Sequence, residues 1–290
     1  MISIENEFLK ISFQTKGAEM ASIFNKQTQT EHLWQADPAV WPWHAPNLFP
    51  IVGGLFNNEL QVNGQGYHLN RHGFARESEF KLIDSNPTHA KFSLPFSEAT
   101  LAVYPYRFEF QVLYDLSEQD LHVTYKVINQ DGQTVYFSVG AHPAFQVPFK
   151  ADENYEDYYL EFENPEPLLT HLLSANGLFS GERELVPTDG RKLWLSKNLF
   201  DRDALVLKNI TSKKVSVRSK NHDQSLSISF EDFKDLGIWA KPGAPFVCIE
   251  PWLGYADTEG KITDISQKEA IEKVGRGHVF EAKFTISLKN

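Results

Sequence analysis

Residues 108–127 read FEFQVLYDLSEQDLHVTYKV, and this stretch decides the fold class of the chain. Apolar side chains occupy alternate positions on both sides of the segment SEQD at 117–120, and most positions between them are polar. A period of two, interrupted by one short polar turn, is typical of two antiparallel strands that bury a single face. The stretch therefore predicts a β-hairpin that lies on a hydrophobic core.

The same period recurs toward both ends of the chain. It is found at residues 8–13, 135–139, 215–230 around a turn at 220–223, and 280–288. Helical periodicity is confined to residues 265–274, where Asp264 or Ser266 is available as an N-cap and two turns are expected. Hairpins without alternating helices predict an all-β fold, a large antiparallel β-sandwich with few short helices.

The composition fits a well-packed globular protein. Of the 290 residues, 41% are hydrophobic, and 22 Phe, 10 Tyr and 6 Trp supply a large aromatic core. No Pro-, Gly- or Ser-rich linker divides the chain, so residues 1–290 are expected to form a single domain.

Charge and cysteine content limit the possible partners and location. A net charge of −10 disfavours binding to nucleic acid or to an anionic membrane surface. The N-terminus lacks the basic and apolar regions of a signal peptide, and no apolar run approaches the ~20 residues that span a bilayer. The sole cysteine, Cys248, suits a reducing compartment and is expected to be a buried strand residue, so a cytoplasmic location is predicted.

Three short segments each place a proton-carrying side chain among small or rigid neighbours. They are RHGFAR at 71–76, GAHPAF at 140–145 and CIEPW at 248–252. Their two histidines, His72 and His142, and the carboxyl group of Glu250 supply an acid, a base and a hydrogen-bonding group. Proton transfer on a neutral polar substrate needs no metal and no organic cofactor, and none is expected.

These segments, together with APNLFPIVG at 45–53, resemble in order and spacing the motifs of the aldose 1-epimerase (galactose mutarotase) family, and most closely its LacX-type branch. The resemblance covers nearly the whole chain. It implies a galactose mutarotase-like supersandwich with the sugar site in a cleft on one sheet. It also implies that Glu250 is the general base, His142 the general acid and His72 a sugar-binding residue.

Further site residues follow from the same resemblance. The family's site usually includes an aspartate, for which Asp201 and Asp203 are candidates, with Asp203 favoured. Among the tryptophans, Trp239 and Trp252 are expected near the cleft, because aromatic faces pack against sugar rings, while Trp34, Trp41 and Trp43 are expected mainly in the core.

The arginines do not decide between a free sugar and a phosphorylated sugar as the substrate. Many relatives carry an arginine shortly after the Phe-Pro-x-x-Gly segment, whereas this chain reads GGLFNN at 53–58, which favours a free sugar. Arg76, which with Arg71 brackets His72, matches a phosphate-binding arginine of related hexose-6-phosphate epimerases. A single arginine can instead hold a cleft carboxylate in place, and this role is favoured for Arg76.

Each assignment has a structural alternative. His142 could be a core histidine bonded to a carbonyl, Glu250 a solvent-side carboxylate at a sheet edge, and the two aspartates part of a solvated turn. With the resemblance, the sequence predicts an aldose 1-epimerase that interconverts the α and β anomers of a hexose such as galactose or glucose. The alternatives are a hexose-6-phosphate 1-epimerase and a carbohydrate-binding or sensor protein without turnover. A glycoside hydrolase is disfavoured, because it would need two flanking carboxylates and only Glu250 has such a setting.

Overall fold

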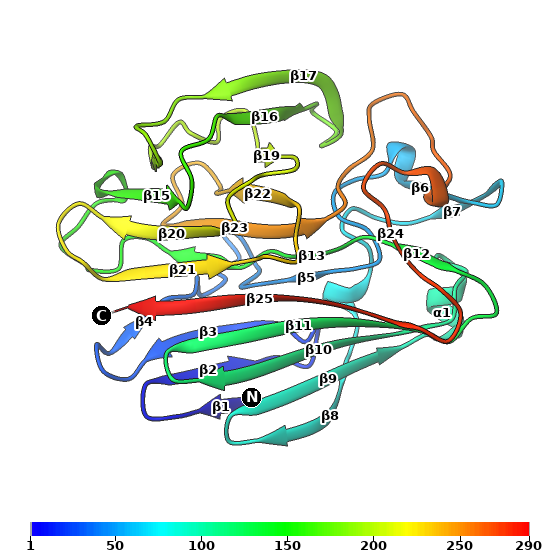
Figure 1. Ribbon diagram of the computed structural model, residues 1–290, viewed down its shortest axis with the longest axis horizontal. Coiled ribbons are helices and arrows are strands. Elements are labelled where there is room, and N and C mark those ends of the chain that lie inside the picture. Colours follow the sequence, from blue (N-terminus) through cyan, green and yellow to red (C-terminus); the bar gives the residue numbers. More distant parts are fainter. Residues whose placement is uncertain (1, 290) are drawn as a thin grey trace.

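The computed structural model describes residues 2–289 and consists mainly of antiparallel sheets (Figure 1). The larger of the two main sheets has nine strands. In spatial order they are β18 (Lys192–Trp194), β15 (Tyr158–Phe162), β20 (Lys214–Ser219), β21 (Ser225–Ser229), β25 (Val279–Lys289), β11 (Asp120–Asn129), β10 (Phe108–Ser117), β9 (His89–Pro95) and β8 (Lys81–Asn86). The long C-terminal strand β25, red in Figure 1, runs between β21 and β11.

The predicted hairpin at 108–127 is confirmed as β10 and β11. Its register pairs Phe110 with Val127 and Val112 with Tyr125, so the alternate apolar side chains share one face. That face is 0–6% exposed, whereas the polar positions between them are mostly half-buried or exposed. The hairpins expected around 220–223 and the strand expected at 280–288 are likewise present as β20–β21 and β25.

The second main sheet has eight strands and carries the candidate site. In order they are β17 (Phe179–Val186), β16 (Leu168–Leu173), β19 (Leu205–Leu207), β22 (Asp235–Trp239), β23 (Phe246–Leu253), β13 (Val139–Ala141) and β5 (Asn47–Leu48), with β14 (Ala144–Gln146) also paired to β23. Every residue of β23 is buried. A strand buried on both faces needs a continuous apolar run, which FVCIEPWL supplies except at its glutamate.

Aromatic side chains and a few buried polar groups join the two main sheets. The ring of Phe49 stacks on that of Phe110, with centroids 4.5 Å apart. The hydroxyl of Tyr125 donates to Oδ1 of Asn47 at 2.7 Å, and Nδ2 of Asn47 donates to the carbonyl of Gly17 at 2.9 Å. Asn47 therefore satisfies buried polar groups between the sheets.

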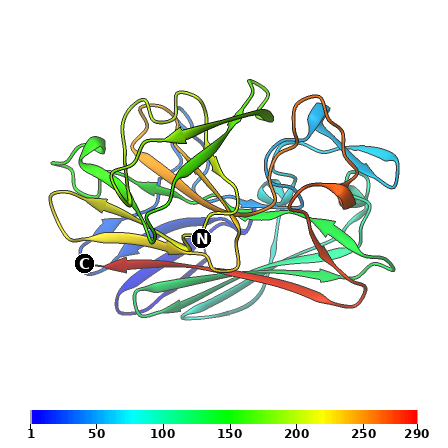
Figure 2. The same cartoon turned by 45° about the horizontal axis from the view of Figure 1, so that its top comes forward.

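The remaining elements are smaller. They are the sheet β1 (Ile2–Glu5), β2 (Leu9–Phe13), β3 (Met20–Asn25) and β4 (Thr30–Glu31), the pair β6 (Glu59–Val62) and β7 (Gln65–His68), the pair β12 (Val135–Phe137) and β24 (Glu272–Val274), the short α-helix α1 (Glu98–Leu101), and the 3₁₀ turns η1 (Phe56–Asn58), η2 (Ala75–Glu77), η3 (Tyr155–Asp157) and η4 (Ile265–Gln267). The sheet formed by β1 to β4 packs against the nine-stranded sheet through the contact of Phe13 with Tyr114. In Figure 2 the β6–β7 hairpin and the loop that carries η4 lie together at one end of the molecule. The predicted all-β sandwich with few short helices is confirmed.

The prediction of a two-turn helix at 265–274 is wrong. Only the 3₁₀ turn η4 forms, capped by the side chain of Asp264, which accepts from the backbone N–H of Ser266 at 3.0 Å. Ala270 then has a φ of +56°, which ends any helix, and residues 272–274 pair with β12. Pairing with another strand outweighs a weak local helical period.

No helix within residues 2–289 is long and apolar enough to cross a membrane.

Candidate active site

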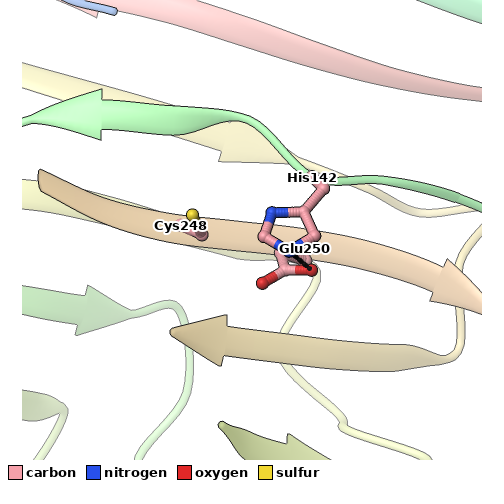
Figure 3. Close-up of side chains that lie close together, drawn as sticks. All are labelled: His142, Cys248 and Glu250. Atoms are coloured by element: carbon pink, nitrogen blue, oxygen red, sulfur yellow. Dashed lines mark ion pairs between the residues drawn. The ribbon is translucent and has the colours of Figure 1, made fainter. Parts of the chain in front are cut away.

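Strand pairing brings His142 and Glu250 together. Strand β23 pairs with β13 through Gly140 and Trp252 and with β14 through Ala144 and Cys248. Two-residue steps between these pairs place His142, in the short loop between β13 and β14, opposite Glu250. The Nε2 atom of His142 lies 3.2 Å from Oε2 of Glu250 (Figure 3).

Alternation along β23 decides which side chains reach the site. Val247, Ile249 and Leu253 lie on one face of the strand by alternation, and Glu250 and Trp252 lie on the other face, where both line the cavity. Two glycines on the flanking strands give the indole of Trp252 its space. A Cβ atom at Gly140 or at Gly237 would lie 2.5 Å from that ring.

A tight turn presents His72 to the same region. Its backbone N–H donates to the carbonyl of Gly53 at 2.9 Å, and its Nδ1 accepts from the N–H of Gly53 at 3.1 Å. This hydrogen bond assigns the proton of the neutral ring to Nε2, so His72 presents a donor to a ligand. Gly73 is required beside it, because its φ is +70° and a Cβ there would lie 2.3 Å from the carbonyl oxygen of Phe49.

The segments converge on one cavity of about 500 Å³. Its walls include every residue that the sequence predicted for the site. The lining residues are Trp41, Arg71, His72, Arg76, His142, Phe200, Asp203, Ala204, Trp239, Pro242, Glu250 and Trp252. Polar groups therefore converge in a concave site with aromatic walls, which is the usual character of a small-molecule site.

Burial disfavours charge on both members of the central pair. Glu250 is 1% exposed, and burial raises its pKa well above the usual 4.5; Arg71 opposes this shift and Asp203 adds to it. His142 is 9% exposed, and burial lowers its pKa to about 3, with Arg76 and Arg71 acting in the same direction. Both groups therefore favour their uncharged forms.

The two arginines carry positive charge without a carboxylate partner. Among residues 2–289, neither Arg71 nor Arg76 forms an ion pair within 4.0 Å. Arg76 donates from Nη2 to the carbonyl of Arg71 at 3.1 Å and lies over the ring of Trp43, 5.2 Å from its centroid. The expectation that Arg76 holds a cleft carboxylate is therefore wrong, because stacking and a backbone carbonyl hold its guanidinium.

The structure distinguishes the two candidate aspartates. Asp203 lines the cavity, whereas Asp201 is exposed and does not. Asp203 has a φ of +74° and accepts at Oδ1 from the N–H of Ala204 at 2.7 Å, so a local turn orients its carboxylate. Arg202 pairs with Glu184 rather than with either aspartate.

Sequence reasoning gave too little weight to Trp41 and missed Phe200 and Pro242. Trp41 stacks on the imidazole of His142, with centroids 5.1 Å apart and planes at 28°, and Trp239 meets the same imidazole edge-on at 6.0 Å. The cluster of aromatic residues and prolines at 41–46 could have indicated that Trp41 lies at the site. Phe200 and Pro242 lie in loops whose approach to the cavity has no local sequence signature.

Cys248 lies behind the cavity wall, close to His142 and Glu250, and does not line the cavity itself. It is fully buried two residues before Glu250 on the same face of β23, and burial raises the pKa of its thiol. One donor atom each of His142, Cys248 and Glu250 all lie within 4.8 Å of one another. These are the described residues that could hold a metal ion.

Fold and site together define a β-sandwich protein with a polar, aromatic-walled cavity of a size for small molecules. The family model described as Aldose 1-epimerase matches residues 1–262. The chain is 34% identical to the chromosomal Protein LacX of Lactococcus lactis subsp. lactis over 284 residues, which is 94% of each chain.

Two solved structures extend the likeness to the fold. A galactose mutarotase related enzyme from Lactobacillus acidophilus has 35% identity and a TM-score of 0.94, over 100% of this chain and 97% of that one. A galactose mutarotase-like protein from Lactobacillus casei ATCC 334 has 32% identity and a TM-score of 0.94 over the full length of both chains.

The chain belongs to the aldose 1-epimerase family, in its LacX-type branch. It is an isomerase that acts on carbohydrates. The family membership expected from the sequence motifs is confirmed.

Proposed function

We propose that this protein interconverts the α and β anomers of a hexose such as galactose or glucose, with Glu250 as general base and His142 as general acid. The observation that carries the proposal is the pair itself. A carboxyl oxygen and an imidazole nitrogen lie 3.2 Å apart at the base of a cavity large enough for a sugar. Binding alone would require no such proton-carrying pair.

In the proposed reaction, the carboxylate of Glu250 takes the proton of the anomeric hydroxyl while the imidazolium of His142 protonates the ring oxygen. The C1–O5 bond breaks and the C1 oxygen becomes an aldehyde. Rotation about C1–C2 and the reverse proton transfers close the ring on the other face. No electrons are gained or lost, so one carboxyl group and one imidazole complete the cycle.

Burial has a specific consequence for this cycle. The pair carries one proton throughout, on His142 when the ring is closed and on Glu250 when it is open. The open-chain state therefore coincides with the uncharged pair, which burial favours through the raised pKa of Glu250 and the lowered pKa of His142. Arg71, which favours the carboxylate, limits that preference. The low-dielectric site thus lowers the energy of the ring-opened intermediate.

The remaining residues hold the sugar in this proposal. The Nε2–H of His72 donates to a sugar oxygen, the carboxylate of Asp203 accepts from a hydroxyl, and the rings of Trp252, Trp239 and Trp41 contact the C–H faces.

Polarimetry on freshly dissolved α-D-galactose and α-D-glucose tests the proposal. The optical rotation should relax faster than the spontaneous reaction, in proportion to protein concentration. A rate equal to the spontaneous rate for both sugars, with sugar binding intact, would instead favour a carbohydrate-binding protein without turnover.

A second candidate, a hexose-6-phosphate 1-epimerase, is favoured by one observation. Arg71 and Arg76 both line the cavity, and neither forms an ion pair within 4.0 Å among residues 2–289. Nε of Arg76 is buried with no hydrogen-bond acceptor. Guanidinium groups with free donors are well suited to a phosphate, so the polarimetry includes galactose and glucose 6-phosphates. Preference for the phosphorylated sugars would establish the second candidate over the first.

A further inference from the structure

The proposed proton transfers leave one reactive group next to the catalytic pair without a role. That group is the thiol of Cys248, the only cysteine of the chain. Figure 3 shows it beside the imidazole of His142 and on the same strand as Glu250. A sulfur, a nitrogen and an oxygen donor lie within 4.8 Å of one another, and all three residues are buried.

Two atoms of this cluster have unused bonding capacity. Nδ1 of His142 and Oε2 of Glu250 are buried and have no hydrogen-bond partner among the described residues. Oε2 lies 3.2 Å from Nε2 of His142, but the contact lacks the alignment of a hydrogen bond. Buried polar atoms without partners are uncommon, and an ion that accepts their lone pairs is one way in which proteins satisfy them.

We propose that His142, Cys248 and Glu250 form a binding site for a thiophilic divalent cation of the zinc group, and that the bound cation inhibits the enzyme. The cation would take one bond from Sγ, one from an imidazole nitrogen and one from a carboxylate oxygen. The thiol releases its proton to solvent, as does the carboxyl group when it is protonated. A fourth ligand would come from the cavity that His142 and Glu250 line.

The donor set selects the cation. Thiolate and imidazole ligands favour Zn²⁺ and Cd²⁺, whereas Mg²⁺ and Ca²⁺ require oxygen ligands, of which the cluster offers a single carboxyl group. Zinc bonds of about 2.0–2.3 Å at tetrahedral angles separate donors by roughly 3.3–3.6 Å. The donors would therefore need to approach by about 1 Å from their present limit of 4.8 Å when the cation binds.

Inhibition is expected because the residues that hold the cation include Glu250 and His142. This step rests on the proposed function. A cation held by Glu250 and His142 takes the lone pairs that accept the sugar's protons. Sugar and cation would compete, since both use the base of one cavity. Cation binding itself does not depend on turnover.

The experiment titrates Cd²⁺ into the full chain, with calorimetry for affinity and ultraviolet absorbance for thiolate-to-cadmium charge transfer. Because the chain has one cysteine, any such band reports Cys248. Cys248→Ala removes the ligand. Cys248→Ser, whose side chain has nearly the same volume as cysteine, replaces the alanine variant if that variant does not fold. Metal-dependent inhibition is measured for each protein relative to its own metal-free rate.

His89→Gln is the matched control. His89 lies on the nine-stranded sheet, with Nδ1 2.6 Å from Asp115 and Nε2 3.8 Å from Asp84, so it offers a competing surface site that lacks sulfur. Removal of this surface site should leave the charge-transfer band and the inhibition unchanged.

We expect one Cd²⁺ per chain with a thiolate band, displacement by galactose, and affinity weaker by about a hundredfold in the Cys248 variants. Three outcomes would each overturn the proposal. They are Cd²⁺ binding without the thiolate band, equal inhibition of wild type and the Cys248 variants, and loss of Cd²⁺ binding in His89→Gln. A thiolate band on a protein that catalyses no anomer exchange would leave the metal site standing and refute the enzymatic function instead.

Discussion

Replacing Glu250 by glutamine should abolish most of the anomer exchange and leave the fold intact. The side chain is 1% exposed, and an amide of the same shape fits the same space. It cannot accept the anomeric proton, and a positioned general base contributes about 10²–10⁴-fold in rate. The rate constant in saturating sugar, measured by polarimetry and corrected for spontaneous mutarotation, should therefore fall by that factor.

The same substitution has a pH-dependent effect on stability. Burial raises the folded-state pKa of Glu250 above the ordinary 4.5, so the folded protein prefers the protonated carboxyl group. This preference adds to the free energy of unfolding in full below pH 4.5. The added stability is lost as pH rises through the raised pKa, by up to about 1.4 kcal/mol per pH unit. The glutamine variant carries no such penalty and should be more stable than wild type at neutral pH, with the difference vanishing below pH 4.5.

Thermal unfolding of both proteins from pH 4 to 8 measures this difference. Glu250→Asp, which retains a titrating carboxyl group but withdraws it from His142, is the matched control for rate. Mutarotation at the parent's rate in Glu250→Gln would refute the assignment of the base. A stability difference that is constant with pH would refute the inferred burial of a titrating carboxyl group.

Four further substitutions test the other site residues and the packing beneath them. His142→Asn should lower kcat with little change in KM, and His72→Asn should raise KM as well, because the first is assigned a proton transfer and the second a hydrogen bond to the sugar; saturation kinetics separate the two. Arg76→Ala should reduce kcat/KM for a hexose 6-phosphate by about ten- to a hundredfold and spare the free hexose, since a charge-assisted contact is worth about 1.5–3 kcal/mol. Gly237→Ala should displace the ring of Trp252, which the new Cβ would approach to 2.5 Å, and cost about 1–3 kcal/mol of stability by thermal unfolding together with activity.

These three expectations have clear contrary outcomes. Equal effects on KM alone for both histidine variants would contradict the assigned acid. Equal losses on free and phosphorylated sugar in Arg76→Ala would remove the phosphate from consideration. Gly132→Ala is the control for added volume, because a Cβ at Gly132 meets no atom within 4 Å, and a similar loss in that variant would remove the steric explanation for Gly237.

The sequence was sufficient for the fold class, and the site residues it suggested stay a prediction. Period-two alternation at 108–127 is a local property of strands with one buried face, and it predicted the pairing of β10 with β11. The motifs around His72, His142 and Glu250 resemble those of the family, and the residues that this resemblance implied for the site all line one cavity.

What depended on long-range packing was not available from the sequence. Residues 265–274 carry a helical period, but β24 pairs with β12, a partner more than a hundred residues away. Arg76 was assigned to a carboxylate, yet its guanidinium stacks on Trp43, which a different segment supplies.

Only the tertiary structure decided the distances on which the chemistry depends. The sequence placed Glu250 and His142 108 positions apart, and the pairing of β23 with β13 and β14 brought their side chains to 3.2 Å. The same pairing buried Cys248 against both and shifted two pKa values in opposite directions. Composition and periodicity determine which faces of the chain avoid water, whereas contact between particular side chains requires the register of strands that are distant in sequence.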